Sequence, residues 1–444
     1  MDNIVQNKEI EYTKQNATIE FEKGNYPLAK TILEALWDDS NKDNVYLLYD
    51  YGKALRKVGA SVKFIEICRE INTNKLVLSN KWIISTLCWC LYDCYIKNYS
   101  ITEEDNFNEF IKRAEYIRNN CVQMNADEHF KTPYVLTIRK VVKTYNERVS
   151  KNFKEILKWL SCLDPDKLSE EVFKFKDETG KERELASQKE FYYQHMAKAL
   201  EKTEEYEICI TICEKAFKQI KKFHYRNNTW LKARMYFSKC MLQEDIEKAI
   251  AEYKGLAYRE NYWFMYHKLS QICFRYNKVP EALLYISKAY MCKFEYEKMI
   301  NLLLDTALLW QANGNSANAK CFFQASSYYR KRQGWSFPEE LQYAINHFDI
   351  DIKEKPNIKE IQRISNDYIA TIEVKTDRYK GMINNIILHG GAGFITPNHG
   401  GSNVYFNMKN VIGKIVLTKG DIVEYELSKR DNGKIWAVKI TKRN

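Results

Sequence analysis

The hydrophobic periodicity of this sequence changes once, near Arg378, and that change limits what the chain can fold into. Before it, prolines are few and apolar residues recur with a helical period of about 3.6 residues. After it, apolar and polar residues alternate between Gly-rich turns. We therefore expect a multidomain protein, with an all-α region over 1–349, a linker over 350–376 and a small all-β domain over 377–444.

The helical region contains a repeated pattern of small and bulky residues. In its clearest units a small residue recurs at spacings of 40, 33 and 37 residues, at Cys209, Ala249, Ala282 and Ala319. Small residues at these positions let paired helices approach closely, while large ones fill the space between repeats. The pattern resembles the tetratricopeptide repeat, whose period is about 34 residues. The resemblance implies a helical solenoid that recruits a protein partner.

Two stretches depart from this helical pattern. The polar residues 175–182, which include Gly180, predict an exposed loop. The linker contains Pro356 and mixed charges, and there we expect a short helix after Asn357 followed by a strand over 369–374.

Five strands fit the alternating pattern of the C-terminal domain, at 379–388, 392–396, 403–408, 421–428 and 434–441. Five strands in about 65 residues are typical of an OB-type barrel. Two of them are aromatic and are joined by a Gly-rich turn, Gly391-Ala392-Gly393-Phe394-Ile395-Thr396-Pro397 and Val404-Tyr405-Phe406-Asn407-Met408. This arrangement resembles the nucleic-acid-binding strands of cold-shock domains, and the resemblance extends over 379–441.

The cold-shock resemblance implies that bases of single-stranded RNA or DNA stack on outward-facing aromatic side chains. Strand alternation predicts that Ile395, Val404 and Phe406 point into the barrel and that Phe394, Tyr405 and Asn407 point outward. Several family positions differ here, because Asn384-Asn385 replaces a Lys-Trp pair, Ala392 an aromatic residue, Asn407 a His and Met408 a Phe. The candidate nucleic-acid-binding residues are Phe394, Tyr405, Asn407, Met408, Asn385 and Trp436, with Lys380, Lys409, Lys434 and Lys439 as candidate phosphate contacts. For Trp436 the alternative is partial burial, and for the lysines it is simple solvation.

The positive charge of the chain is concentrated in this domain. Residues 378–444 contain 11 Lys and Arg against four Asp and Glu, which places +7 of the chain's +11 net charge in about a seventh of its length. Such a local excess favours a polyanionic ligand.

Motifs for catalysis and for metal binding are absent from the sequence. There is no phosphate-binding loop of the G-x-x-x-x-G-K-[ST] type, no H-E-x-x-H and no G-x-S-x-G. The 12 cysteines all lie between Cys68 and Cys321, without zinc-site spacing, and we expect buried reduced thiols. We expect no enzyme activity and no cofactor. The N-terminus lacks the order of a signal peptide, and no apolar run reaches about 18 residues, so we expect a cytoplasmic protein without a membrane partner.

The sequence thus predicts a non-enzymatic adaptor. Its barrel contacts single-stranded nucleic acid, RNA more than DNA, and its repeats recruit a protein. Two alternatives belong to other classes. In one, the chain is a protein–protein scaffold whose barrel is a structural or docking module. In the other, it is the sensor subunit of a stress or defence complex whose catalysis resides on another chain.

Overall fold

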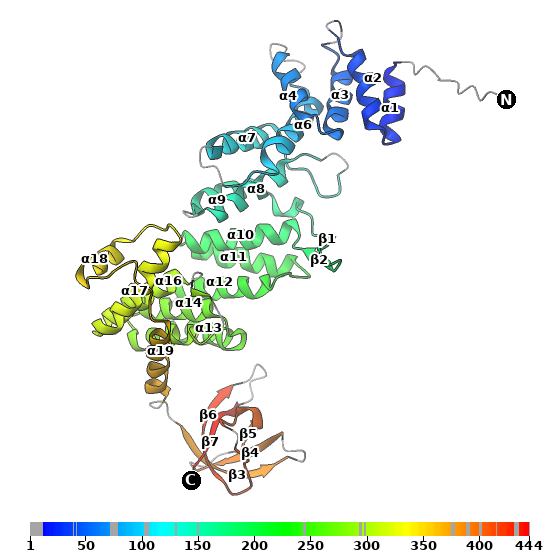
Figure 1. The fold of residues 1–444 in the computed structure, drawn as a ribbon. Helices are drawn as coiled ribbons and strands as arrows, with labels where there is room; N and C mark the ends of the chain where they lie inside the picture. The colour runs from blue at the N-terminus through cyan, green and yellow to red at the C-terminus, as the bar shows by residue number, and fades with distance from the viewer. Residues whose placement is uncertain are drawn as a thin grey trace, which may run out of the picture. The chain divides into compact units, whose positions relative to one another are not determined.

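The computed structural model of the protein describes residues 12–38, 40, 42–71, 79–101, 106–128, 131–148, 151–242, 246–292, 295–296, 299–373, 378–387, 391–398, 402–413, 415–429 and 435–443. The chain divides into two compact units, 1–261 and 262–444. Each consists mainly of helices that follow one another along the chain, and unit 2 also contains the C-terminal strands (Figure 1).

The helices of unit 1 are short to medium in length. They are α1 Lys14–Glu22, α2 Tyr26–Leu36, α3 Val45–Lys57, α4 Ser61–Glu70, α6 Lys81–Leu91, α7 Phe107–Asn120, α8 Tyr134–Glu147, α9 Phe153–Leu160, α10 Gln188–Lys202, α11 Tyr206–Gln219, α12 Asn227–Leu242 and α13 Ile246–Glu260. A π-helical turn, Tyr92–Ile96, extends α6, and a 3₁₀ turn, Pro165–Lys167, follows α9. The helices of unit 2 are α14 Trp263–Arg275, α15 Val279–Ala289, α16 Ile300–Ala312, α17 Ser316–Arg332, α18 Glu339–His347 and α19 Ile358–Glu373.

Local sequence sets many of the helix boundaries. The side chain of Asn44 accepts a hydrogen bond from the Leu47 amide at 3.1 Å at the start of α3, and Ser187 does the same for Glu190 at 3.1 Å at the start of α10. Caps of this kind stabilise a helix by about 1 kcal/mol each. The turn between α1 and α2 contains Gly24 at φ +83°, a conformation that other residues adopt only with strain.

The helices pack as a repeat solenoid, as the sequence predicted. The most extensive helix contacts join neighbours in sequence, such as α1 with α2, α10 with α11, α14 with α15 and α16 with α17. The recurring small residues lie in α11, α13, α15 and α17 and are almost fully buried: Cys209, Ala249, Ala282 and Ala319. Close approach also explains Gly52, since a Cβ there would lie 2.5 Å from the Phe64 ring of α4.

The linker segment contains a longer helix than expected. After Asn357, α19 continues to Glu373, so the strand predicted from residue 369 is wrong over the described part of that stretch. Ile361 and Ile364 are buried, and α19 packs against α15 and α17. The Tyr368 hydroxyl donates to the Pro280 carbonyl at 3.2 Å. Residues 374–377 lie outside the described part of the chain.

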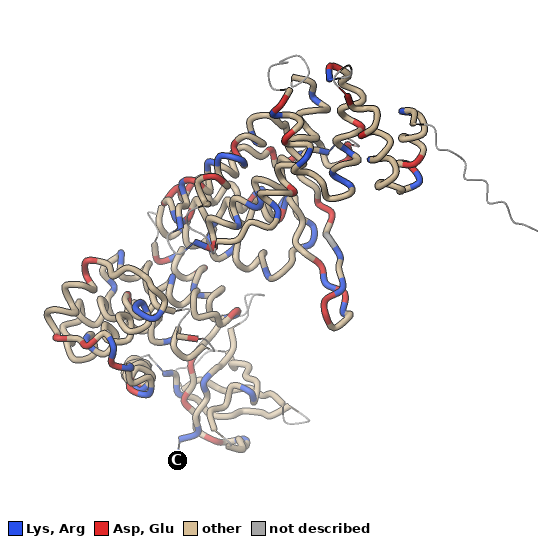
Figure 2. The backbone as a smooth tube through the Cα atoms, turned by 45° about the horizontal axis from the view of Figure 1, so that its top comes forward, with Lys and Arg blue, Asp and Glu red and all other residues tan. Residues whose placement is uncertain are grey.

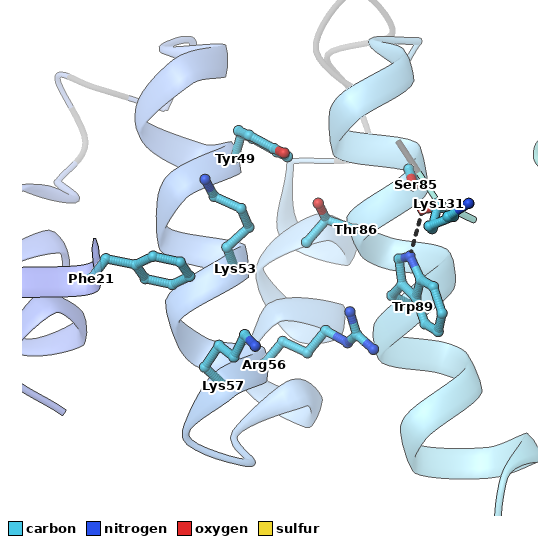
Figure 3. A pocket seen from close by; sticks show the side chains of 9 residues that line it. All are labelled: Phe21, Tyr49, Lys53, Arg56, Lys57, Ser85, Thr86, Trp89 and Lys131. Atoms are coloured by element: carbon cyan, nitrogen blue, oxygen red, sulfur yellow. Dashed lines mark hydrogen bonds between the residues drawn. The ribbon is translucent and has the colours of Figure 1, made fainter. Parts of the chain in front are cut away.

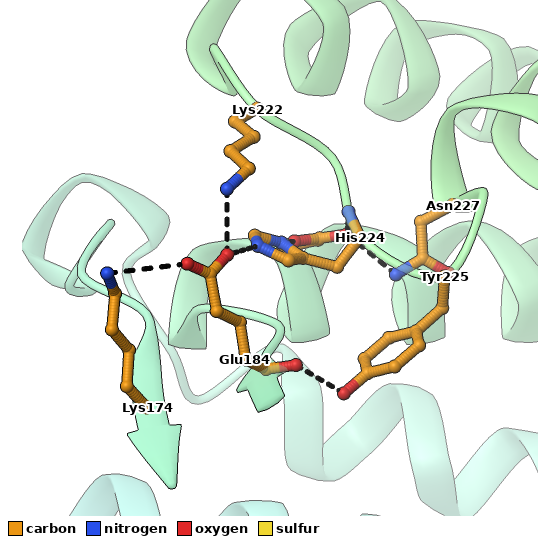
Figure 4. Close-up of polar contacts among 7 residues, drawn as sticks. Lys174, Glu184, Lys222, His224, Tyr225 and Asn227 are labelled. Carbon is orange, nitrogen blue, oxygen red and sulfur yellow. Dashed lines mark hydrogen bonds and ion pairs between the residues drawn. The ribbon is translucent and has the colours of Figure 1, made fainter. Parts of the chain in front are cut away.

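The stretch predicted as an exposed loop is exposed but is a β-hairpin. Strands β1 Phe173–Lys176 and β2 Glu182–Leu185 pair antiparallel around a turn in which Asp177 accepts from Arg183 at 2.8 Å. Glu184 connects this hairpin to the loop before α12, where it lies 3.2 Å from the His224 ring (Figure 4). The other ring nitrogen of His224 lies 2.8 Å from Glu190. Hydrogen bonds from Lys222 and then His224 lower the pKa of Glu184 to about 2.

The C-terminal strands form a closed barrel in the order β3-β4-β5-β7-β6. Their bounds are β3 Tyr379–Ile386, β4 Ala392–Pro397, β5 Val404–Asn407, β6 Ile422–Lys429 and β7 Ile435–Lys442, with a 3₁₀ turn at Met408–Asn410. Strands β5 and β7 are parallel and the other pairs antiparallel. This is the predicted OB-type barrel, and each strand lies within two residues of its expected bounds.

Among the described residues of the barrel, eight buried side chains form its core: Ile383, Ile395, Phe406, Leu417, Val423, Tyr425, Ala437 and Ile440. Burial alternates along β4, as its predicted in-and-out pattern requires. Val404 is partly buried and packs against this core, so the inward prediction for Val404, Phe406 and Ile395 is confirmed. Gly393 has no room for a side chain, because a Cβ there would lie 2.5 Å from the Asn385 carbonyl oxygen and 2.6 Å from the Phe406 ring.

Candidate nucleic-acid interface

One row of side chains crosses four neighbouring strands on the outside of the barrel. Register pairs Asn385 of β3 with Phe394 of β4, Phe394 with Tyr405 of β5, and Tyr405 with Trp436 of β7. Residues directly opposite one another in register share a face of the sheet. We call Asn385, Phe394, Tyr405 and Trp436 the aromatic row. The sequence placed these residues on separate strands, and the fold aligns them.

Two rings of the aromatic row contact each other. The Phe394 and Tyr405 ring centroids lie 5.7 Å apart with an interplanar angle of 74°. This edge-to-face arrangement is a favourable geometry for aromatic pairs. Both side chains are partly exposed, as is Trp436, while their strand neighbours Gly393, Ile395 and Phe406 are buried. The outward prediction for Phe394 and Tyr405 therefore agrees with the structure, and their rings offer surface to a ligand.

Two other predicted residues have structural roles. The Asn407 side chain accepts a hydrogen bond from the Lys409 amide at 2.9 Å and thereby caps the 3₁₀ turn after β5. Met408 lies in that turn and packs against the barrel core. Both side chains are partly exposed. Because the turn directs Met408 toward the core, only a part of its side chain is available to a ligand. Lys434 lies outside the described residues.

The basic residues of the barrel divide into those held by carboxylates and those that are not. Lys439 contacts Glu426 at 3.3 Å, Lys442 contacts Asp421 at 2.8 Å, and Arg443 contacts Glu424 at 2.8 Å. The bond from Lys442, followed by that of the Thr418 amide, lowers the pKa of Asp421. The predicted phosphate contact of Lys439 therefore competes with an internal ion pair.

Lys380 and Lys409 remain as exposed cations of the predicted set. Among the residues that the structure describes, neither makes an ion pair. Lys380 lies on β3, five residues before the aromatic row, and Lys409 follows β5 in the 3₁₀ turn. They are the predicted lysines best able to reach a phosphate without breaking an internal contact.

The sequence did not single out two residues that shape this face. Ile387 is 41% exposed, and its amide donates to the Ala392 carbonyl at 2.9 Å, so it lies beside the aromatic row on the same face as Asn385. Its position two residues after Asn385 was the available signal. Arg378 supports the barrel from within, because one guanidinium nitrogen donates to the Lys439 carbonyl at 2.6 Å and to the Thr441 hydroxyl at 2.9 Å.

Within the described part of the chain, no group of three or more His, Cys, Asp or Glu residues is arranged to hold a metal ion. None of the twelve cysteines is in a disulfide; eight are buried, as predicted, and four are partly exposed: Cys94, Cys162, Cys292 and Cys321. In the same described ranges, none of the helices has both the length and the apolar character that a membrane span requires.

The fold and this face define a class of protein, a helical repeat protein that ends in an OB-type barrel. No protein-family model matches the chain. No curated protein matches it either. Among solved structures, the chain is similar to "Human IFIT1 dimer with m7Gppp-AAAA" at 11% identity and a TM-score of 0.30, over 83% of this chain and 92% of that one. A second is "Circular tandem repeat protein with novel repeat topology and enhanced subunit contact surfaces", at 12% identity and a TM-score of 0.15, over 81% and 75%. At these TM-scores neither likeness says what this chain binds.

Proposed function

We propose that this chain is a non-enzymatic adaptor whose C-terminal barrel, of cold-shock type, binds single-stranded nucleic acid, with RNA preferred to DNA. Its tetratricopeptide-like repeats recruit a protein partner. The observation that carries the proposal is the aromatic row, because Phe394, Tyr405 and Trp436 come from three neighbouring strands and lie on one outward face. Stacking on such a platform tolerates any base sequence, since every base has a π-face.

The charge of the barrel supports the same ligand. The domain contributes +7 of the chain's net charge, and Lys380 and Lys409 are exposed beside the strands of the aromatic row. Along the helical repeats, by contrast, Lys and Arg are interspersed with Asp and Glu (Figure 2). The polyanion is therefore expected to contact the barrel, where the local excess is greatest.

The test is fluorescence anisotropy with labelled single-stranded RNA and DNA and the full-length protein. Phe394→Ala combined with Tyr405→Ala removes two stacking surfaces, each worth about 1–3 kcal/mol per base, so Kd should rise by at least about 30-fold. Tyr343→Ala is the matched control, because Tyr343 is 62% exposed on α18, and it should leave Kd unchanged. Circular dichroism should show that both variants keep the wild-type fold.

A salt series tests the phosphate contacts separately. For single strands the slope of log K against log salt is about −0.7 per neutralised phosphate, so Lys380→Gln with Lys409→Gln should make the slope shallower by about 1.4. The proposal is wrong if the full-length protein binds no oligonucleotide at about 50 mM salt, or if the aromatic double variant binds as tightly as wild type.

A second function is favoured by a different observation. Met382 and Ile422 are neighbours in register on β3 and β6, and they are 44% and 42% exposed. Adjacent exposed apolar residues are typical of protein contacts. In this alternative the barrel is a docking module of a scaffold or of a sensor subunit. Oligonucleotide binding that is absent at low salt would favour it over the nucleic-acid adaptor.

A further inference from the structure

A cavity of about 340 Å³ lies in unit 1 between α1, α3 and α6 (Figure 3). Helix α3 contributes one face to it, with Tyr49, Lys53, Arg56 and Lys57 at helical spacing. The other lining residues come from α1, from α6 and from the segment before α8, and they are Phe21, Ser85, Thr86, Trp89 and Lys131. This volume is within the range of small-molecule sites.

Aromatic rings form the walls of the cavity. The ammonium of Lys53 lies 4.5 Å from the Tyr49 ring centroid and 5.2 Å from that of Phe21, so these rings face a common cation. On α6, the Trp89 indole N–H donates to the Lys131 carbonyl at 3.0 Å, which fixes the orientation of its ring. The Arg56 guanidinium lies 4.1 Å from the Trp89 ring centroid. The cavity therefore has three aromatic surfaces and a fixed arrangement of cations against them.

The charge of the lining has one sign. Four of the nine described residues that line it are Lys or Arg, and none of the nine is a carboxylate. Lys53, Arg56 and Lys57 come from α3, whereas the Lys131 ammonium donates to the carbonyls of Asn125 and Ala126. Two carboxylates stand outside the lining: Asp93 pairs with Arg56, and Asp50 is shared by Lys53 at 3.1 Å and Lys14 at 3.4 Å.

Lys57 completes the excess of positive charge. Among the described residues it has no carboxylate partner, and its ammonium lies 5.3 Å from the Tyr26 ring centroid. Lys53 and Arg56 are partly buried and Lys57 is exposed, so an anion in the cavity would reduce the mutual repulsion of these neighbouring cations.

We propose that this cavity binds a nucleotide, a nucleoside 5′-phosphate, as a site separate from the barrel. A phosphate provides the negative charge that Lys57 lacks, and a second anionic contact for Lys53, whose partner Asp50 is shared with Lys14, through charge-assisted hydrogen bonds. An aromatic base fits the remaining surfaces, because bases stack on aromatic rings and on guanidinium planes. A purely apolar ligand would cover Lys57 without giving it a partner, and an inorganic anion would leave the aromatic walls unused. The inference stands on α1, α3 and α6 and does not depend on the proposed function of the barrel.

Isothermal titration calorimetry of the full-length protein with adenosine 5′-monophosphate tests this site at low salt. Two further titrations divide the ligand into its parts: adenosine keeps the base and lacks the phosphate, and ribose 5-phosphate keeps the phosphate and lacks the base. We expect one binding site per chain and an affinity for adenosine 5′-monophosphate roughly tenfold or more above that for either part. The proposal is overturned if adenosine or ribose 5-phosphate binds as tightly as adenosine 5′-monophosphate, because the missing part of the nucleotide would then contribute nothing to binding.

Protein variants locate the site. Lys53→Gln with Lys57→Gln should weaken binding by about tenfold or more. Lys112→Gln with Lys158→Gln makes the same charge change outside the cavity, at side chains that are 71% and 56% exposed, and it should leave binding unchanged. The proposal is refuted if the two double variants bind alike.

The barrel variant separates this proposal from the function of the barrel. Phe394→Ala with Tyr405→Ala should bind adenosine 5′-monophosphate like wild type. Loss of nucleotide binding in this variant, with binding retained by the Lys53 and Lys57 variant, would assign the nucleotide to the barrel and overturn the cavity site. Failure of the cavity titrations, conversely, leaves the oligonucleotide result intact.

Discussion

The partly buried histidine of α10 makes unit 1 sensitive to mild acid. His195 is partly buried, and its ring centroid lies 4.2 Å from that of Phe191. Burial first, and then the nearby cations Lys198, Arg234, Lys143 and Arg139, lower its pKa from 6.5 to about 3. They come from α8, α10 and α12, so positive groups surround the ring on all three helices. Protonating His195 in the folded state would therefore add a positive charge among these cations, at a site that solvent reaches only in part.

The sign and size of the effect follow from this lowered pKa. Below pH 6.5 the unfolded chain protonates its histidine, while the folded chain keeps His195 neutral until about pH 3. The unfolded state then binds more protons, so the free energy of unfolding falls as the pH falls through this window. Each pH unit costs about 1.4 kcal/mol, so the loss reaches about 2 kcal/mol at pH 5 and is small at pH 7.

Hydrogen–deuterium exchange of α10 amides measures this loss locally, which suits a chain of more than one unit. His195→Gln removes the titrating group and keeps a polar side chain near Asn146. Between pH 7 and pH 5, wild-type α10 should lose about 30-fold more protection than the variant, after correction for intrinsic exchange. His267→Gln, in α14, is the control and should follow wild type in α10. If wild type and His195→Gln lose the same protection, the histidine does not carry the acid sensitivity and the reasoning fails.

Two substitutions test packing elsewhere in the chain. Gly393→Ala should destabilise the barrel by about 1–3 kcal/mol, because the new methyl group would lie 2.6 Å from the Phe406 ring. Gly391→Ala is the control, since a methyl group there has no neighbour within 4 Å. Equal thermal unfolding midpoints for the two variants would contradict the steric argument. Glu190→Ala should lower the free energy of unfolding by about 1–3 kcal/mol, because it removes the buried acceptor of the His224 amide and ring. It should also speed protease cleavage in the 177–181 turn. Unchanged cleavage would show that other contacts hold the hairpin.

The sequence was most informative where a local pattern and its packing favour the same structure. The barrel strands alternate in burial as their residues alternate in polarity, and Gly393 marks the point where β3 and β4 approach too closely for a side chain. The start of α19 was also readable, because Asn357 precedes an amphipathic pattern. Its end was not, since the β-branched residues from Ile369 favour a strand locally. Ile361 and Ile364 are buried against other helices, and this packing stabilises α19 enough for it to continue through the β-branched residues.

Tertiary structure alone brings the remaining features together. The β1–β2 hairpin offers only a short apolar alternation, Phe173 and Phe175 in β1, and its partner strand β2 is mostly polar and exposed. The cavity of unit 1 combines Lys53 of α3 with Trp89 of α6 and the Lys131 backbone, and no short motif connects residues so far apart in sequence. Within the aromatic row, the parallel pairing of β5 with β7 places Trp436 beside Tyr405, which strand alternation by itself leaves undetermined.

The charge of the barrel and its aromatic row should control different steps of nucleic-acid binding. The net charge of +7 acts over distances of about a Debye length, so it increases the rate of encounter with a polyanion and depends on salt. Fewer side chains can contact a phosphate directly than the net charge suggests, because Lys439, Lys442 and Arg443 already form ion pairs with carboxylates. Residence of the bound strand then depends mainly on stacking against Phe394 and Tyr405. In stopped-flow kinetics the lysine variant should therefore lower the association rate, and the aromatic variant should raise the dissociation rate. The reverse assignment would mean that phosphate contacts, and not stacking, hold the strand on the barrel.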